Sequence, residues 1–173
     1  MQVPFINLVQ QRTARVAIGA STARKMGPAG TVAAARNYLA NIDLAQFAHA
    51  NVDANQFNTA LDMETANLQA FLPVNGRHWG SSRKFLNIFL RDAVYNSYLR
   101  EFYHLHMIEN LLEVPLDKNV GNRLRCEPEG VQLPVWPGVI NIDAGRNRQY
   151  QAVATLVGAR LAMAVCHLDL LYW

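Results

Sequence analysis

The sequence predicts an all-α fold, and three observations carry that prediction. Apolar residues recur mainly at the three- and four-residue spacing of amphipathic helices. Strand-like alternation with β-branched residues is confined to a brief stretch around residues 139–142. Gly, Pro and Asn interrupt the helical pattern at intervals. The chain has 173 residues, 51% of them hydrophobic, which suffices for one domain with its own core over residues 1–173.

Several helices are expected in the N-terminal half. The first covers residues 6–15, and two glycines and a proline at 25–30 then break the chain. A second helix over residues 31–40 has Thr31 as its cap. A further helix starts near residue 43, and another covers residues 53–71.

A tight connection is expected at residues 73–82, which contain one Pro, one Asn and two Gly. Ser81 or Ser82 is expected to cap the helix that follows, over residues 83–103, because a serine hydroxyl accepts hydrogen bonds from first-turn amides. This is the clearest helix of the chain, with an apolar stripe formed by Leu86, Phe89, Leu90 and Ala93.

The C-terminal part is expected to open with a short helix near residues 107–112. Pro115 cannot lie inside a helix, so a new helix should start after it, with Asp117 as its cap. Residues 126–145 hold three prolines and three glycines and are expected to form a loop. Two last helices are expected over residues 147–164 and 166–173.

The charged residues are few and uneven in kind. They make up 17% of the chain, the net charge is +3, and 13 of the 16 basic residues are Arg. An Arg-rich surface is compatible with a nucleic-acid partner, because guanidinium groups grip phosphate with two prongs, but Arg also serves ordinary salt bridges. Cys126 and Cys166 lack zinc-ligand spacing, and their use fits a reducing cytoplasm. No apolar run reaches membrane-spanning length, so no membrane partner is expected.

The most unusual pair is Arg83-Lys84, expected in the first turn of a helix. Two cations are locally unfavourable at that positive end, and a bound phosphate would remove the conflict. The same field, with partial burial beside Trp79 and Phe85, would lower the pKa of Lys84 and make its amine a nucleophile. The alternative is that both side chains are simply exposed to solvent.

The second unusual feature is the run Leu112-Glu113-Val114-Pro115-Leu116-Asp117. Asp117 on its own is interpreted as a helix cap, which contributes about 1 kcal/mol. A capping aspartate can also keep one oxygen free to face a site.

Together these features resemble a known family. The run from Ser82 to Leu124, SRKFLNIFLRDAVYNSYLREFYHLHMIENLLEVPLDKNVGNRL, resembles the catalytic stretch of the archaeal-type 8-oxoguanine DNA glycosylases, a branch of the helix-hairpin-helix glycosylase superfamily. Members place a catalytic lysine after the hairpin and a catalytic aspartate in a later Pro-x-Asp. The resemblance implies that Lys84 and Asp117 are the catalytic pair.

The C-terminal run HLDLLYW resembles the family's closing pattern, in which an Asp and a Trp four positions later belong to the pocket for the extruded base. The resemblance thus implies base-pocket roles for Asp169 and Trp173, although a terminal Trp equally often seals a core. The first 72 residues match the family poorly. The glutamine that reads oxidised guanine in the family has several candidates here: Gln10, Gln11, Gln46 and Gln56.

The resemblance implies a two-lobed helix-hairpin-helix fold with a central cleft, and a monomeric enzyme that extrudes a modified base from duplex DNA and cleaves its glycosidic bond, with or without strand nicking. No metal or organic cofactor is implied. The expected DNA contacts, which position the strand, are Arg77, Trp79, Gly80, Ser82 and Arg83. The base is an oxidised guanine or a bulky modified phage pyrimidine, the latter in antiviral defence. A non-catalytic DNA-binding module and a helical interaction protein remain the alternatives.

Overall fold

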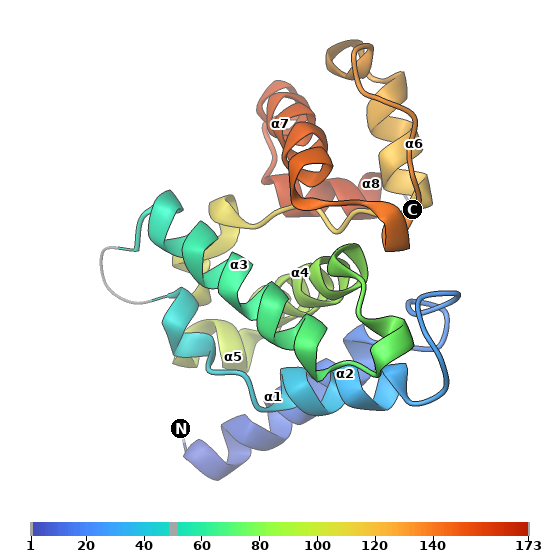
Figure 1. The fold of residues 1–173 in the computed structure, drawn as a ribbon. Helices are drawn as coiled ribbons and strands as arrows, with labels where there is room; N and C mark the ends of the chain where they lie inside the picture. The colour runs from blue at the N-terminus through green and yellow to red at the C-terminus, as the bar shows by residue number, and fades with distance from the viewer. Residues whose placement is uncertain (1, 49–51, 173) are drawn as a thin grey trace.

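The computed structural model describes residues 2–48 and 52–172, and within them it is all-helical, as predicted (Figure 1). The N-terminal half consists of five α-helices and three 3-10 turns. They are α1 (Val3–Ala17), α2 (Thr31–Ala40), η1 (Leu44–Phe47), α3 (Ala54–Phe71), η2 (Val74–Gly76), α4 (Trp79–Tyr95), α5 (Ser97–Phe102) and η3 (Leu105–Leu111).

The C-terminal part, drawn in orange and red, lies over one side of this half (Figure 1). Its elements are α6 (Lys118–Cys126), η4 (Pro128–Gly130), η5 (Val139–Asn141), α7 (Ala144–Leu161), η6 (Val165–His167) and α8 (Leu168–Tyr172). The expected loop over residues 126–145 therefore contains two 3-10 turns, and the brief strand-like pattern near residue 139 forms one of them.

Aspartate caps fix several helix starts where they were expected. The Asp53 side chain accepts a hydrogen bond from the Gln56 backbone amide, and the Asp53 backbone amide donates one to the Gln56 side chain, which completes a capping box. Asp117 caps α6 by accepting hydrogen bonds from the Asn119 and Val120 amides. Gly30, with a φ of 92°, precedes α2 at the position predicted for Thr31. Thr31 is the first helical residue, and its hydroxyl donates to the Pro28 carbonyl.

The long helix predicted over residues 83–103 is wrong at both ends. It begins four residues earlier, at Trp79, with His78 at the N-cap and no side-chain cap, so Ser81 and Ser82 lie inside the helix. It stops at Tyr95 because the Asn96 side chain accepts from the Tyr98 and Leu99 amides and caps a second helix, α5.

The core divides into two hydrophobic clusters. The larger one joins α1–α5 and η3, with Phe57, Phe85 and Phe89 fully buried. The smaller one lies among α6, α7 and α8 around Tyr150, whose ring packs edge-on against Trp136. The segment from Leu112 to Asp117 connects the two clusters, and Val114 is fully buried in the second.

Gly80 marks a close approach between the start of α4 and η5. A Cβ atom at this position would lie 2.1 Å from the Val139 carbonyl oxygen and 2.3 Å from Cγ2 of Ile142. Both distances are far below van der Waals contact, and the first involves backbone, which cannot rotate away. Only glycine lets the two segments meet here.

We therefore expect Gly80→Ala to destabilise the protein by about 1–3 kcal/mol, the usual cost of forcing extra atoms into a packed site. Thermal or urea unfolding would measure it. Gly145→Ala is the matched control, because Gly145 also lies in the first turn of a helix and its added Cβ would meet only the Asp143 carboxylate, at 3.3 Å. The control should change stability by less than about 1 kcal/mol. Equal effects of the two substitutions would contradict the close approach at Gly80.

Candidate functional site

The structure brings Lys84, Asp117 and Asp169 to the wall of one cavity, although they are far apart in the sequence. This cavity has a volume of about 460 Å³. Its walls come from α1, the turn after it, α4, the Pro115–Asp117 segment and α8. The lining residues are Val16, Ala17, Ser21, Thr22, Lys84, Ile88, Arg91, Asp92, Pro115, Asp117, Asp169 and Leu170. We call it the lysine cavity.

The Lys84 amine is nearly removed from solvent. The side chain is 9% exposed, and Nζ lies 3.8 Å from Oδ2 of Asp117. Nζ also donates a hydrogen bond of 3.4 Å to the Thr22 carbonyl. Burial lowers the pKa of Lys84 below its ordinary value, and the Asp117 charge opposes this by favouring the ammonium form.

The lowered pKa arises differently from the sequence-based expectation. Lys84 is the sixth residue of α4, so it lies outside the first turn and away from the free amides of the helix start. Desolvation is the larger cause, and no anion at the helix start is needed to explain it. The structure therefore gives no support to the expectation that Arg83 and Lys84 flank a phosphate at that end.

Asp117 uses its two carboxylate oxygens for two purposes. Oδ1 accepts hydrogen bonds from the Asn119 and Val120 amides, at 2.8 and 3.0 Å, and so caps α6. Oδ2 points to Lys84. The cap predicted from the sequence is confirmed, and the second oxygen does face a site.

Asp169 lies in α8, 9% exposed, and forms an ion pair with Arg91 of α4. Arg91 also binds Asp92, with 2.9 Å between Nη2 and Oδ1. Its guanidinium therefore bridges two carboxylates on the lysine cavity. Trp173, the other expected base-pocket residue, lies outside the described residues.

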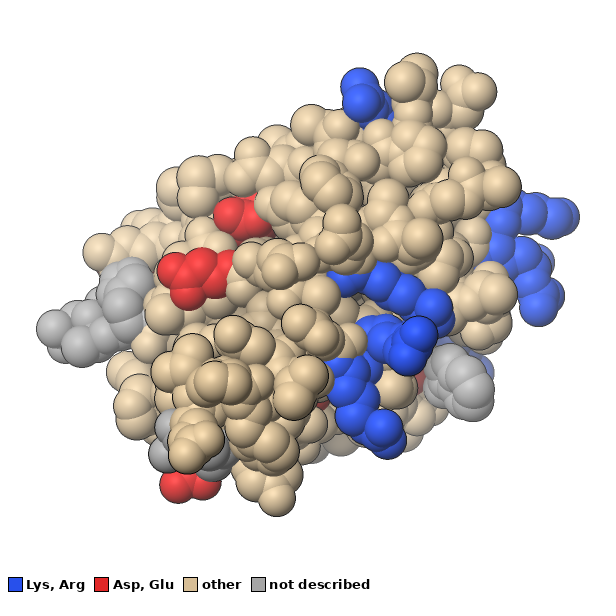
Figure 2. All heavy atoms as spheres, turned by 90° about the horizontal axis from the view of Figure 1, so that it is seen from below, with Lys and Arg blue, Asp and Glu red and all other residues tan. Residues whose placement is uncertain are grey.

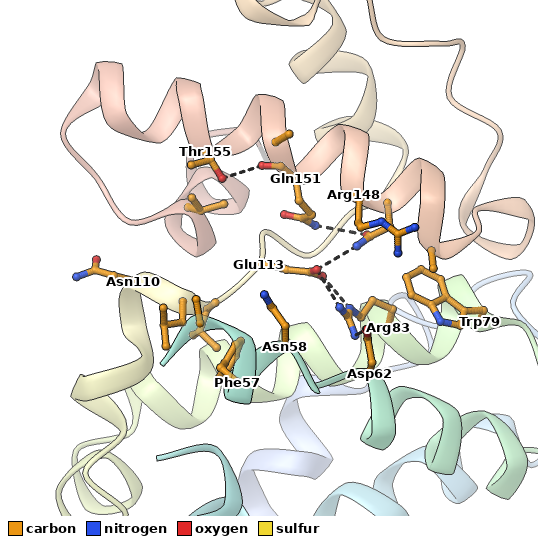
Figure 3. Close-up of a pocket in the computed structure, with 17 residues that line it drawn as sticks. Phe57, Asn58, Asp62, Trp79, Arg83, Asn110, Glu113, Arg148, Gln151 and Thr155 are labelled. Atoms are coloured by element: carbon orange, nitrogen blue, oxygen red, sulfur yellow. Dashed lines mark hydrogen bonds and ion pairs between the residues drawn. The ribbon is translucent and has the colours of Figure 1, made fainter. Parts of the chain in front are cut away.

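A second cavity, of about 420 Å³, lies between α3, α4 and α7 (Figure 3). Arg83 and Trp79 are on its wall, and the Arg83 guanidinium lies 5.4 Å from the centre of the Trp79 ring. Figure 3 shows Glu113 pointing into the middle of this region, toward Arg83. We call it the glutamate cavity.

Four buried or half-buried donors converge on Glu113. Arg83 binds both carboxylate oxygens, at 2.8 and 3.0 Å, in a two-pronged ion pair. Asn87 of α4 and Asn147 of α7 donate one hydrogen bond each, at 2.8 and 3.1 Å. Beside them, Gln151 of α7 pairs with the Val114 backbone through its carbonyl and its amide. The sequence analysis gave Glu113 no role, although an acidic residue between Leu112 and Val114 is a signal of a buried carboxylate.

The expected DNA contacts near the hairpin are mostly not available to a ligand. Arg83 is 5% exposed and is also held by Asp62 and Thr65, so its guanidinium is engaged inside the protein. Ser82 is fully buried, and its hydroxyl donates to the His78 carbonyl. Gly80 is buried beneath the Val139 carbonyl. The structure thus buries these three expected contacts, because α4 starts earlier than expected and is covered by η5.

Arg77 and Trp79 remain accessible. Arg77 is exposed, and its Nε donates a hydrogen bond of 2.9 Å to the Leu72 carbonyl, which closes the turn after α3. Trp79 is half-buried at the glutamate cavity.

No family model, curated protein or solved structure matches the chain. Among residues 2–48 and 52–172, no single helix is long and apolar enough to cross a bilayer. Helix α7 and the segment Val165–Tyr172 meet that test only when joined, and the chain bends by 93° between them.

We expect Glu113→Ala to cost about 3–5 kcal/mol, because it leaves the buried Arg83 without its main counter-charge and two amides without an acceptor. Chemical denaturation would measure the loss. Glu101→Ala, at an exposed glutamate of α5, should change stability by less than about 0.5 kcal/mol. A loss below about 1 kcal/mol for Glu113→Ala would show that the network does not join the two clusters.

Proposed function

We propose that the protein is a DNA glycosylase that uses Lys84 as a nucleophile and Asp117 as its electrostatic and proton-transfer partner. The observation that carries the proposal is a buried amine with a lowered pKa, 3.8 Å from a carboxylate oxygen, on the wall of an open cavity. Groups tuned in this way gather at catalytic sites more than elsewhere.

The finer fold belongs to the same proposal. A two-lobed helix-hairpin-helix arrangement with a central cleft is consistent with the division of the core into two clusters. The lysine cavity takes its walls from α1 and α4 on one side and from Pro115, Asp117 and α8 on the other. In this proposal, the connection between α3 and α4 corresponds to the hairpin that precedes the catalytic lysine in the family.

The chemistry follows from the two groups. The neutral Lys84 nitrogen attacks C1′ of the sugar and forms a C–N bond. The glycosidic bond breaks, its electron pair leaves with the base, and the base takes up a proton from water. The attacking nitrogen gives a proton to Asp117, the ring oxygen O4′ takes that proton as the sugar ring opens, and a protonated Schiff base is left on Lys84. β-Elimination from this intermediate, in which water takes up a C2′ proton and the 3′ phosphate leaves, nicks the strand.

Asp117 is suited to its part because it is held in place. Its capping hydrogen bonds fix one oxygen, so the other keeps its direction toward the amine without an entropic cost at the moment of reaction. Its negative charge stabilises the cationic sugar as the base departs.

The burial of Lys84 favours an enzyme over a non-catalytic DNA binder. A phosphate clamp works best as an exposed ammonium, whereas a side chain 9% exposed and desolvated favours the neutral amine. The substrate is an oxidised guanine or a bulky modified pyrimidine, and duplexes carrying each base distinguish the two.

The covalent intermediate gives the main test. Wild-type protein incubated with abasic or modified duplex and borohydride should form a trapped complex, whereas Lys84→Arg and Lys84→Met should not, because neither side chain can attack C1′. Both variants should still bind DNA. Lys118→Arg is the matched control, since Lys118 is exposed and close to Asp117 in the chain. Trapping that survives in both Lys84 variants would overturn the nucleophile assignment, and loss of trapping in the control would show that the assay does not report on Lys84.

The pH dependence of trapping gives an independent test. The neutral fraction of Lys84 increases as pH rises through a pKa that burial holds below 10.5, so the trapping rate should rise with pH about a midpoint below that value. Asp117→Asn removes the charge that favours the ammonium form, so the rise should move to lower pH. The limiting rate should fall on the order of 10²-fold or more, because proton transfer and charge stabilisation are lost. A rise that moved to higher pH in Asp117→Asn would contradict this coupling.

A further inference from the structure

The N-terminal segment has an unbalanced charge. Residues 1–42 contain five cations, Arg12, Arg15, Arg24, Lys25 and Arg36, and no Asp or Glu. This segment holds less than a third of the protein's 16 basic residues, but none of its 13 acidic ones. The segment forms α1, the turn after it and α2, so the imbalance is concentrated on one side of the fold.

Three of these arginines line a groove between α1 and α2, which pack side by side. The groove has a volume of about 640 Å³. From α1 it is lined by Leu8, Gln11, Arg12 and Arg15, and from α2 by Ala33, Arg36, Asn37 and Ala40. Each set has the i, i+3, i+4, i+7 spacing of one helix face, so both helices present a continuous row of side chains to the groove. We call it the arginine groove.

The guanidinium groups of the arginine groove are available to a ligand. Arg12 and Arg15 are exposed, and within the described ranges no carboxylate lies in ion-pair distance of either, or of Arg36. The Nε atom of Arg36 donates a hydrogen bond of 2.7 Å to the Ile18 carbonyl. This bond holds the side chain in place and leaves its two terminal nitrogens for a ligand. Figure 2 views the molecule from the side of α1 and α2, where several Lys and Arg side chains gather near the centre of the face and others lie at its edges.

The arginine groove leads toward the lysine cavity. Arg12 lines both the groove and a neighbouring hollow formed with Val16, Asp92 and Tyr95. Val16 and Asp92 in turn line the lysine cavity. The acidic member of this path, Asp92, is already bound by Arg91, so its charge is largely compensated.

We infer that the arginine groove binds the phosphodiester backbone of the DNA strand whose reacting nucleotide occupies the lysine cavity. The inference rests on the proposed function for the identity of the ligand. It assigns the strand contacts to Arg12, Arg15 and Arg36 on α1 and α2, a surface remote in the sequence from the hairpin.

The chemistry of the groove favours a phosphate chain over a membrane surface. Its lining is concave and carries three guanidinium groups and two amides, while its apolar members are one leucine and two alanines. Membrane association requires a protruding apolar face, whereas planar guanidinium groups match phosphate oxygens two at a time. The rows of arginines along α1 and α2 suit a ligand with charges repeated along its length.

The test measures DNA affinity against salt for the double variant Arg12→Gln/Arg15→Gln. Each lost phosphate contact should weaken binding about tenfold at 0.1 M salt and reduce the slope of log K against log salt by about 0.9. The double variant should therefore bind a fluorescent duplex with an abasic site on the order of 10²-fold more weakly, with a slope smaller by about 2. The matched control is Arg146→Gln, at an exposed arginine in the first turn of α7. It should leave affinity and slope unchanged.

Each outcome decides the inference separately from the proposed chemistry. Unchanged affinity in the double variant, or a loss confined to Arg77→Gln, overturns the groove and places the strand at the hairpin. Absence of DNA binding by the wild type at low salt also overturns it, as does tighter binding of poly-glutamate or of vesicles with anionic lipid than of DNA. If the wild type binds DNA through the groove but forms no trapped complex, the groove stands and the glycosylase proposal fails.

Discussion

The structure depends on one buried interaction, the carboxylate of Glu113 held between α4 and α7. The core consists of two hydrophobic clusters, which the segment from Leu112 to Asp117 joins. Without hydrogen-bond and ion-pair partners, Glu113 in this segment would place an uncompensated charge in the interior. Arg83, Asn87 and Asn147 supply four donors and make that burial possible. Because three of these donors belong to α4, which packs in the first cluster, and one belongs to α7, which packs in the second, the network also sets the direction in which the segment leaves toward Asp117.

The position of Asp117 is a consequence of that direction. Gln151 binds both backbone groups of Val114: its side-chain oxygen accepts from the Val114 amide, and its side-chain nitrogen donates to the Val114 carbonyl. Pro115 then restricts the backbone before the capped helix α6 begins. A carboxylate that has to start α6 and also reach an amine on α4 depends on such constraints, since a freely hinged connection would place it anywhere around the start of α6. The geometry of the lysine cavity thus depends on the buried contacts of Glu113 and Val114.

The sequence was informative where a residue's role is local and less so where it depends on tertiary contact. The cap at Asp117 and the helix start at Asp53 follow from side-chain chemistry within one turn; the first was predicted as a cap and the second as a helix start, and the structure confirms both. The start of α4 was misplaced because serines normally cap helices, whereas here the covering of Gly80 by η5 lets the helix begin at Trp79. Arg83 was interpreted as a free cation because its partners Asp62 and Glu113 are distant in the sequence. The proximity of Lys84 and Asp117 was expected from the family resemblance, which gave Asp169 a separate role in the base pocket. The arginine groove depends on how α1 packs against α2, which the helical spacing along each of them does not reveal.

Arg83 and Lys84 are neighbours in the chain but point into different cavities, since successive helical residues diverge by about 100° around the axis. Helix α4 is thus a rigid partition with one charged side chain on each of two faces. The ion pair of Arg83 with Glu113 and that of Lys84 with Asp117 are both anchored on this one helix. A substitution that displaces α4 would therefore disturb the two cavities together, even when it is made on the side of only one of them.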